Sequence, residues 1–152
     1  MLRWAAPADA PELAQVFFAA VREGPSPYSQ AQRRAWLPEP PSGERWAARL
    51  SRLETLVAES EGRITGFMTV EPGGYIDLAF VLPEHQGTGL FRKLYNRIEQ
   101  RARGRQEPCL WTHASLMAQP AFRAMGFLVI HHETVVRDGH SLARAEMEKR
   151  LK

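Results

Sequence analysis

One stretch of the chain, residues 80–92 (FVLPEHQGTGLFR), constrains the fold more than any other. It joins an apolar segment, Tyr75–Leu82, which has the composition of a strand, to a segment with helical spacing that begins near Gly89. Gly87 and Gly89 allow a positive φ and leave no Cβ in the way. Because the first N–H groups of a helix have no partner within it, a loop at this position suits a phosphate group.

The loop matches neither of two familiar phosphate-binding motifs. It is not a P-loop, because no Gly-Lys-Ser/Thr follows at the required spacing. It is not a dinucleotide fingerprint, because Arg92 stands where the third glycine belongs. Gln86 and Thr88 can add side-chain hydrogen bonds, and Arg92 and Lys93 can add positive charge. Two interpretations remain open: an anion-binding loop, or a glycine pair that only forms a tight turn.

The loop has a counterpart in a known family. Residues 83–89 (PEHQGTG) resemble the Q/R-x-x-G-x-G/A acyl-CoA loop of the GNAT N-acetyltransferase superfamily, with Gln86 and Gly89 at matching positions. Phe91 stands where the family usually has Gly or Ala. The resemblance implies that acetyl-CoA is the co-substrate and that the backbone of this loop holds its pyrophosphate.

A second stretch strengthens the resemblance. Residues 115–127 (SLMAQPAFRAMGF) are similar to the family pattern N-x-x-A-x-x-F-Y-x-x-x-G-F. The matching positions are Ala118, Gly126 and Phe127. Ser115 replaces the family Asn, and Phe122 replaces the family Tyr. Because Phe122 cannot donate a proton, the general acid is left open between water, Tyr95, Ser115 and His113, and loss of catalysis is a further alternative.

The order of elements predicts the fold class. The spacing gives a strand, two or three helices, three strands, a helix and a strand, then a helix and a hairpin around Asp138-Gly139. A strand–helix–strand unit around the loop requires a parallel pair. We expect one α/β (α+β) domain over residues 1–152. The resemblance implies a three-layer, mostly antiparallel sheet of six to seven strands with a central parallel pair, flanked by about four helices.

The resemblance also implies where acetyl-CoA binds. The pantetheine arm would pair with the backbone of residues 78–81, which lead into the loop. A backbone N–H on that strand is a plausible donor to the thioester oxygen. The expected cofactor contacts are Phe80, Val81, Gln86, Gly87, Thr88, Gly89, Leu90, Phe91 and Ser115.

Three side chains are candidates for the base that removes a proton from the acceptor. Asp77 lies on the pantetheine strand, Glu71 ends the preceding strand, and His113 lies near the end of the next parallel strand, where sites gather. We favour Asp77 and His113. Structural alternatives are a salt bridge from Asp77 to Arg123 and a core position for His113.

The acceptor site falls in the segment with the weakest resemblance, residues 25–53. We expect Tyr28 and Trp36 to line it, although Trp36 and Trp46 also suit anchors that pack small helices onto a sheet. The predicted activity is transfer of an acetyl group from acetyl-CoA to a primary amine, on a small molecule or a peptide, by direct attack. The alternative is a non-catalytic acyl-CoA sensor or interaction module.

Composition argues against several other classes of function. The net charge of +3 is too small to indicate a nucleic-acid partner, and aromatic residues do not alternate with the arginines of residues 97–105. Cys109 is the only cysteine, and the adjacent His131 and His132 point to opposite faces of a strand, so we expect no metal. No apolar run suggests a membrane segment or signal peptide. We expect a cytoplasmic protein, with a homodimer through the terminal hairpin as one possibility.

Overall fold

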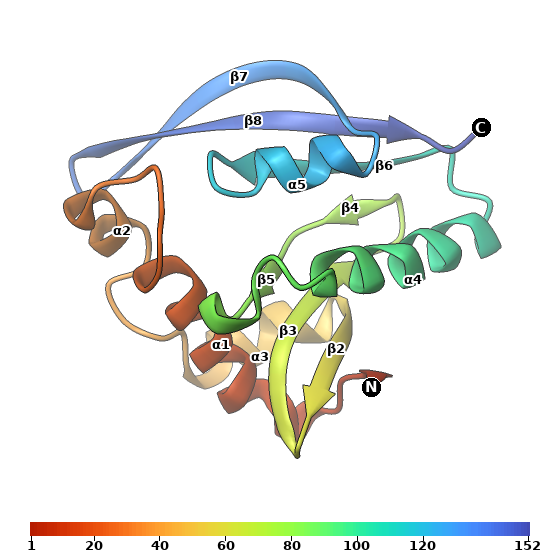
Figure 1. The fold of residues 1–152 in the computed structure, drawn as a ribbon, viewed down its shortest axis with the longest axis horizontal. Coiled ribbons are helices and arrows are strands. Elements are labelled where there is room, and N and C mark those ends of the chain that lie inside the picture. The colour runs from red at the N-terminus through yellow and green to blue at the C-terminus, as the bar shows by residue number, and fades with distance from the viewer.

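Two four-stranded sheets form the centre of the computed structural model, which describes all residues from 1 to 152 (Figure 1). The first sheet has the order β1-β2-β3-β5 and the second β4-β6-β8-β7. The strands are β1 (Leu2–Trp4), β2 (Glu54–Ser60), β3 (Arg63–Val70), β4 (Tyr75–Ile76), β5 (Ala79–Val81), β6 (Cys109–Ser115), β7 (Leu128–Arg137) and β8 (His140–Arg150). The helices are α1 (Ala10–Arg22), α2 (Gln30–Trp36), α3 (Gly43–Ser51), α4 (Leu90–Gly104) and α5 (Gln119–Ala124), with short 3₁₀ turns η1 (Pro7–Asp9) and η2 (Pro83–His85).

The expected strand over residues 75–82 is divided between the two sheets. β4 pairs in parallel with β6, which confirms the predicted parallel pair, whereas β5 pairs antiparallel with β3. Between them, Leu78 is tied to β3 because its carbonyl accepts from the Thr69 N–H at 2.9 Å. The chain therefore leaves one sheet and joins the other within two residues, and the sheets splay apart at this point (Figure 1).

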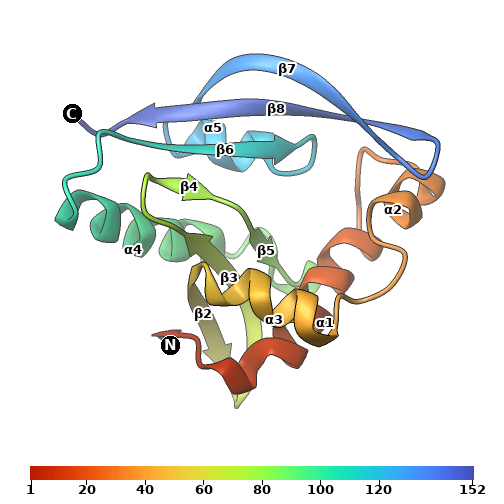
Figure 2. The same cartoon turned by 180° about the vertical axis from the view of Figure 1, so that it is seen from behind.

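The helices divide the interior into two apolar cores. α4 and α5 cover the larger core, which includes Leu94, Ile98 and Phe122 and reaches both sheets. α1 and α3 pack on the other face of the first sheet, where Phe17 and Trp46 contact each other beside Phe67 (Figure 2). The apolar side chains of α1 recur at helical spacing, so that a helix here buries most of them on the face toward this core.

The fold class predicted from sequence, a mixed and mostly antiparallel α/β fold, is confirmed. The sequence did not reveal that the strands form two sheets instead of one continuous sheet. None of the helices combines the length and the apolar character that a membrane span requires.

The arginine-rich end of α4 forms ion pairs within the chain. Arg101 and Arg105 both contact Glu54, and Arg103 contacts Glu99 at 2.9 Å. These pairs fit the interpretation of a solvated helix face better than that of a nucleic-acid surface, because the guanidinium groups already face carboxylates.

Candidate active site

The loop between η2 and α4 presents a row of free backbone donors. Gly87 and Gly89 have φ of 74° and 86°, a left-handed conformation that glycine adopts at little cost. The N–H groups of residues 87–92 donate no hydrogen bond to any backbone carbonyl. The Thr88 Oγ1 donates to the His85 carbonyl at 2.6 Å, and this bond fixes the turn. The loop thus has the donors and the helix start that an anionic group needs.

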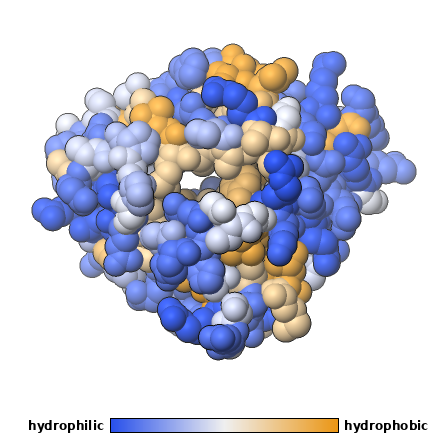
Figure 3. Space-filling view, in the orientation of Figure 1, coloured by the Kyte–Doolittle hydropathy of each residue, from blue (hydrophilic) through white to orange (hydrophobic).

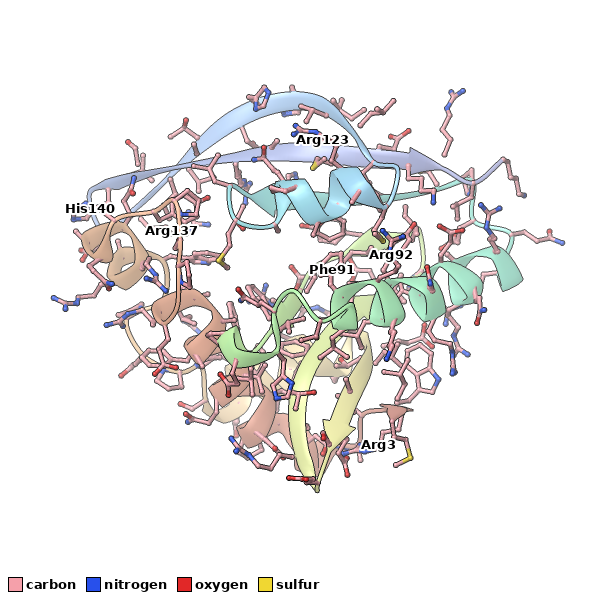
Figure 4. All side chains as sticks on the ribbon, viewed as in Figure 1. Arg3, Phe91, Arg92, Arg123, Arg137 and His140 are labelled. Atoms are coloured by element: carbon pink, nitrogen blue, oxygen red, sulfur yellow. The ribbon has the colours of Figure 1, made fainter.

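A groove, which we call the loop groove, lies beside these donors. Side chains and backbone of β5, the loop, the start of α4 and the start of α5 line it. Among its lining residues are Val81, Gln86, Gly87, Gly89, Phe91 and Arg92. Figure 4 shows Phe91 and Arg92 at the first turn of α4, below α5. Of the predicted cofactor contacts, Thr88 and Leu90 do not line the groove with their side chains; Leu90 packs against the larger core.

One edge of β5 is open. Leu78 and Leu82 bond to β3, so strand alternation directs the N–H and C=O groups of Ala79 and Val81 the other way, toward the gap between the sheets. The Val81 carbonyl accepts from the Gln86 Nε2 at 3.2 Å. The remaining polar groups of this edge can pair with an extended ligand that carries amides.

A second cavity, which we call the cleft, opens on the other side of β5. It brings together side chains from α2, the β4–β5 junction, β6 and α5. The predicted residues that line it are Tyr28, Trp36, Asp77, Phe80, His113, Ser115 and Phe122. Ser115, expected among the cofactor contacts, therefore lines the cleft and not the loop groove, whereas Phe80 lines both.

The loop groove and the cleft meet at three residues. Ala79, Phe80 and Ala118 line both cavities. Figure 3 shows a hollow in this part of the molecule, bordered in part by apolar residues. A ligand lying along the open edge of β5 would therefore place its end against a second ligand in the cleft.

Asp77 forms an ion pair in the cleft. Its two carboxylate oxygens accept from the Arg49 Nε and Nη2 at 2.9 and 3.0 Å, in a bidentate geometry. The suggested salt bridge from Asp77 to Arg123 is wrong, because Arg123 lies on α5 and makes no contact with Asp77. Arg49 therefore holds both oxygens of this carboxylate and fixes its position in the cleft wall.

His113 lines the cleft and lies beside two carboxylates of the β7–β8 hairpin. Its Nδ1 lies 2.8 Å from the Tyr75 hydroxyl, and its Nε2 lies 3.6 and 3.8 Å from carboxylate oxygens of Glu133 and Glu146. Burial, helped by the charge of Asp77, raises the pKa of Tyr75 to about 12. Tyr75 therefore stays protonated near neutral pH and can serve as a hydrogen-bond partner of the imidazole.

Tyr28 and Trp36 both belong to the cleft wall. The Tyr28 hydroxyl donates to the Ala143 carbonyl at 2.5 Å and accepts from the Leu116 N–H at 3.0 Å. Burial raises the pKa of this phenol. Trp36 packs edge-on against Tyr28, with ring centroids 5.8 Å apart, and against Phe80. These contacts fasten the segment around α2 to the β7–β8 hairpin, so that this wall of the cleft is held by distant parts of the chain.

The residues considered as general acid differ in whether they line the cleft. Tyr95 is buried in the larger core, its hydroxyl donates to Glu99 at 2.6 Å, and it lines neither cavity. Phe122 lines the cleft and packs edge-on against Phe91 and Phe127. The Ser115 Oγ accepts from the Ala118 N–H at 3.2 Å. Glu71, weighed as a base, does not line the cleft.

Several residues of the site were not predicted from sequence. Three arginines line the cleft, namely Arg49, Arg137 and Arg144. Ala118 forms part of the junction of the two cavities, whereas Ala79, which also lies there, belongs to the predicted pantetheine strand, residues 78–81. Among the residues not predicted, only Ala118 carried a signal, since it matches the second family motif. No group of three or more His, Cys, Asp or Glu side chains is placed to hold a metal ion.

Comparisons with known proteins identify the family and the fold of this chain. The family model for the acetyltransferase (GNAT) domain matches residues 25–151. A GCN5-related N-acetyltransferase from Rhodopseudomonas palustris, whose description also names a class-II aminotransferase, is 30% identical with a TM-score of 0.87, over 99% of this chain and 95% of that one. The search among curated proteins found no match.

Two more distant structures share the fold. A phosphinothricin acetyltransferase from Sinorhizobium meliloti, solved in complex with acetyl-CoA, is 20% identical with a TM-score of 0.76, over 99% of this chain and 88% of that one. A ribosomal-protein-alanine N-acetyltransferase from Brucella melitensis is 22% identical with a TM-score of 0.71, over 99% of each chain. The family model and the 30% identical structure lead to one conclusion: this chain is an acetyltransferase that belongs to the GNAT family.

Proposed function

We propose that the protein transfers an acetyl group from acetyl-CoA to a primary amine by direct attack. One observation carries the proposal: the groove beside the free loop donors and the cleft meet at Ala79, Phe80 and Ala118, next to the open edge of β5. Acetyl-CoA laid along that edge would place its thioester where an amine in the cleft can reach it.

The backbone supplies most of the binding in this arrangement. The N–H groups of residues 87–92 would hold the pyrophosphate, and the polar groups of Ala79 and Val81 would pair with the pantetheine amides. An N–H of the same edge would donate to the thioester oxygen as negative charge develops there. The amine nitrogen forms the C–N bond, the C–S bond breaks, and the thiolate of CoA leaves with the electron pair.

We assign the removal of the amine proton to His113, acting through a water molecule. The imidazole faces the cleft, and an imidazolium formed there would lie beside Glu133 and Glu146. Asp77 is the weaker candidate because Arg49 holds both of its oxygens. Departure of the thiolate needs no protein acid near neutral pH, since a thiol has a pKa of roughly 8.5 in water.

A non-catalytic acyl-CoA sensor is the second candidate, and Phe122 favours it. This side chain lines the cleft and places no hydroxyl there. The Tyr28 hydroxyl is not a substitute, because it is already bonded to Ala143 and Leu116. A sensor would bind acetyl-CoA without releasing free CoA in the presence of amines.

Turnover with a panel of amines tests the proposal. The protein and acetyl-CoA would be mixed with small primary amines and amine-bearing peptides, and both the free thiol and the mass of the acetylated product would be followed. Equal release of thiol and product supports the proposal. Tight binding of acetyl-CoA with no product from any amine would leave the sensor as the function.

We also propose a cytoplasmic homodimer. β7 is the edge strand of the second sheet, and its apolar residues Leu128, Ile130 and Val136 are exposed. An exposed apolar edge of this kind favours pairing with a second copy. Light scattering on the purified chain should give twice the monomer mass; the monomer mass would contradict the dimer.

A further inference from the structure

The charges that line the cleft are unbalanced. Arg49, Arg137 and Arg144 face it, whereas Asp77 is the only carboxylate among its lining residues. Arg49 and Asp77 neutralise each other in their bidentate pair. With His113 counted as neutral and the Arg144–Glu133 pair also neutral, the cleft wall keeps one unpaired positive charge, that of Arg137.

The other two arginines, Arg137 and Arg144, differ in the ion pairs and hydrogen bonds that they form. Arg144 uses its Nε for Glu133, at 3.1 Å. Arg137 has no carboxylate within ion-pair distance, and its only recorded hydrogen bond goes from Nη1 to the neighbouring Val136 carbonyl, at 3.2 Å. Figure 4 places Arg137 at the turn end of the β7–β8 hairpin, which the bonds of Tyr28 and Gln32 fasten to the segment around α2.

This charge pattern constrains the acceptor. A simple amine is cationic before it loses its proton, and an unpaired arginine in the wall opposes its entry. An acceptor that carries its own acidic group offsets this repulsion, and a planar carboxylate matches the donor geometry of a guanidinium. The aromatic rings of Tyr28, Trp36 and Phe80 also line the cleft and suit an apolar or aromatic spacer.

We propose that the acceptor is an amine that also carries a carboxylate or similar acidic group, bound by Arg137 with help from Arg144, while its amine points to the junction at Ala79. The inference rests on the proposed function and deepens it. It disfavours polyamines and lysine side chains of basic peptides as acceptors, since they add positive charge to a positive cleft.

A matched pair of acceptors tests the charge preference. 4-(Aminomethyl)benzoate and 4-(aminomethyl)benzamide share an amine and a ring, and they differ in the acidic group. We expect kcat/KM to be at least about tenfold higher for the benzoate, mainly through a lower KM. Equal values, or a preference for the benzamide or for spermidine, would overturn the inference and leave the proposed function standing.

A substitution of Arg137 tests whether this residue binds the acidic group of the acceptor. Arg137→Gln should lower kcat/KM for the benzoate at least about fivefold more than for the benzamide. Arg34→Gln is the matched control, since Arg34 is an exposed arginine of α2 that does not line the cleft, and it should change neither value. An equal loss for both acceptors in Arg137→Gln would contradict a role in binding the acidic group.

Binding separates this inference from the proposed function. If no amine is acetylated, the proposed function fails, and calorimetry with both compounds on the CoA-saturated protein decides the inference. Tighter binding of the benzoate that is lost in Arg137→Gln upholds an acid-binding cleft. Equal binding of the two compounds overturns it.

Discussion

The loop groove and the cleft meet at Phe80, yet they are built in different ways. The loop groove depends on backbone groups of one continuous segment, residues 79–92. The cleft depends on side chains from α2, α3, β6, β7 and β8, which are far apart in the sequence. The comparison teaches that local geometry shapes the proposed cofactor half of the site, whereas long-range packing shapes the proposed acceptor half.

The largest expected effect lies where the two regions meet. Ala118→Leu should lower acetyl transfer by about 10² or more, because a larger side chain at the junction displaces the thioester from the amine, and a shift of ~1 Å is enough for such a loss. Steady-state thiol release measures it. Ala124→Leu at the other end of α5 is the control, since Ala124 is exposed and lines neither cavity. Equal activity of both variants would separate the two cavities functionally.

A substitution in the cleft alone should lower the rate of acetyl transfer without changing the affinity for acetyl-CoA. His113→Gln should lower kcat by about 10², the usual contribution of a general base, and leave the affinity for acetyl-CoA unchanged. Asp77→Asn should cost less, because Arg49 already holds that side chain. A larger loss in Asp77→Asn would reverse the assignment of the base.

A third region, remote from both cavities, should change stability only. Burial opposes ionisation of Glu99, but hydrogen bonds from Lys149, Tyr95 and Arg103 outweigh it and lower the pKa of this carboxyl to about 2. Since the folded pKa lies below the unfolded value, the stabilisation is complete above about pH 4.5 and is lost as the pH falls toward 2.

Glu99→Gln should therefore lower the free energy of unfolding by about 2–3 kcal/mol at neutral pH, and the difference should shrink below pH 4.5. Denaturant titrations at several pH values measure it. Glu39→Gln removes an exposed carboxylate that makes no ion pair, and it should have no such effect. A constant difference across the pH range would show that the charge of Glu99 does not stabilise the fold.

The smallest expected effect comes from restoring the tyrosine hydroxyl that Phe122 lacks. Phe122→Tyr places a phenol in the cleft wall and should raise kcat by less than about tenfold, because the thiolate leaves without an acid. Phe127→Tyr, at a fully buried position outside the cavities, should only lower stability. A much larger gain in Phe122→Tyr would mean that proton donation limits the natural protein.

Sequence reasoning predicted the geometry of the loop before α4 because its signal is local. Gly87 and Gly89 adopt the positive φ that glycine favours, and α4 begins directly after them. The parallel pair of β4 and β6 followed from the connection through α4. The division of residues 75–82 between two sheets could not be predicted, because an apolar strand pattern is the same whether its ends pair with one neighbour or two.

The cleft could be predicted only in part. Tyr28 and Trp36 were identified as wall residues, whereas Arg49, Arg137 and Arg144 were not. The chain has 20 lysines and arginines, and nothing local distinguishes a cleft arginine from a solvated one. The partners of Asp77 and His113, which are Arg49 and Tyr75, lie 28 and 38 residues away in sequence.

Calorimetric titration with acetyl-CoA tests the central claim most directly. The account predicts tight binding to the wild type, loss of binding in Gly89→Trp, and wild-type binding in Gly62→Trp. Gly62 also has a positive φ, 76° against 86° for Gly89, and neither position has a neighbouring atom within 4 Å of a Cβ, so the two substitutions impose similar backbone strain. Absence of binding in the wild type, or undiminished binding in Gly89→Trp, would contradict the assignment of this loop as the acetyl-CoA site.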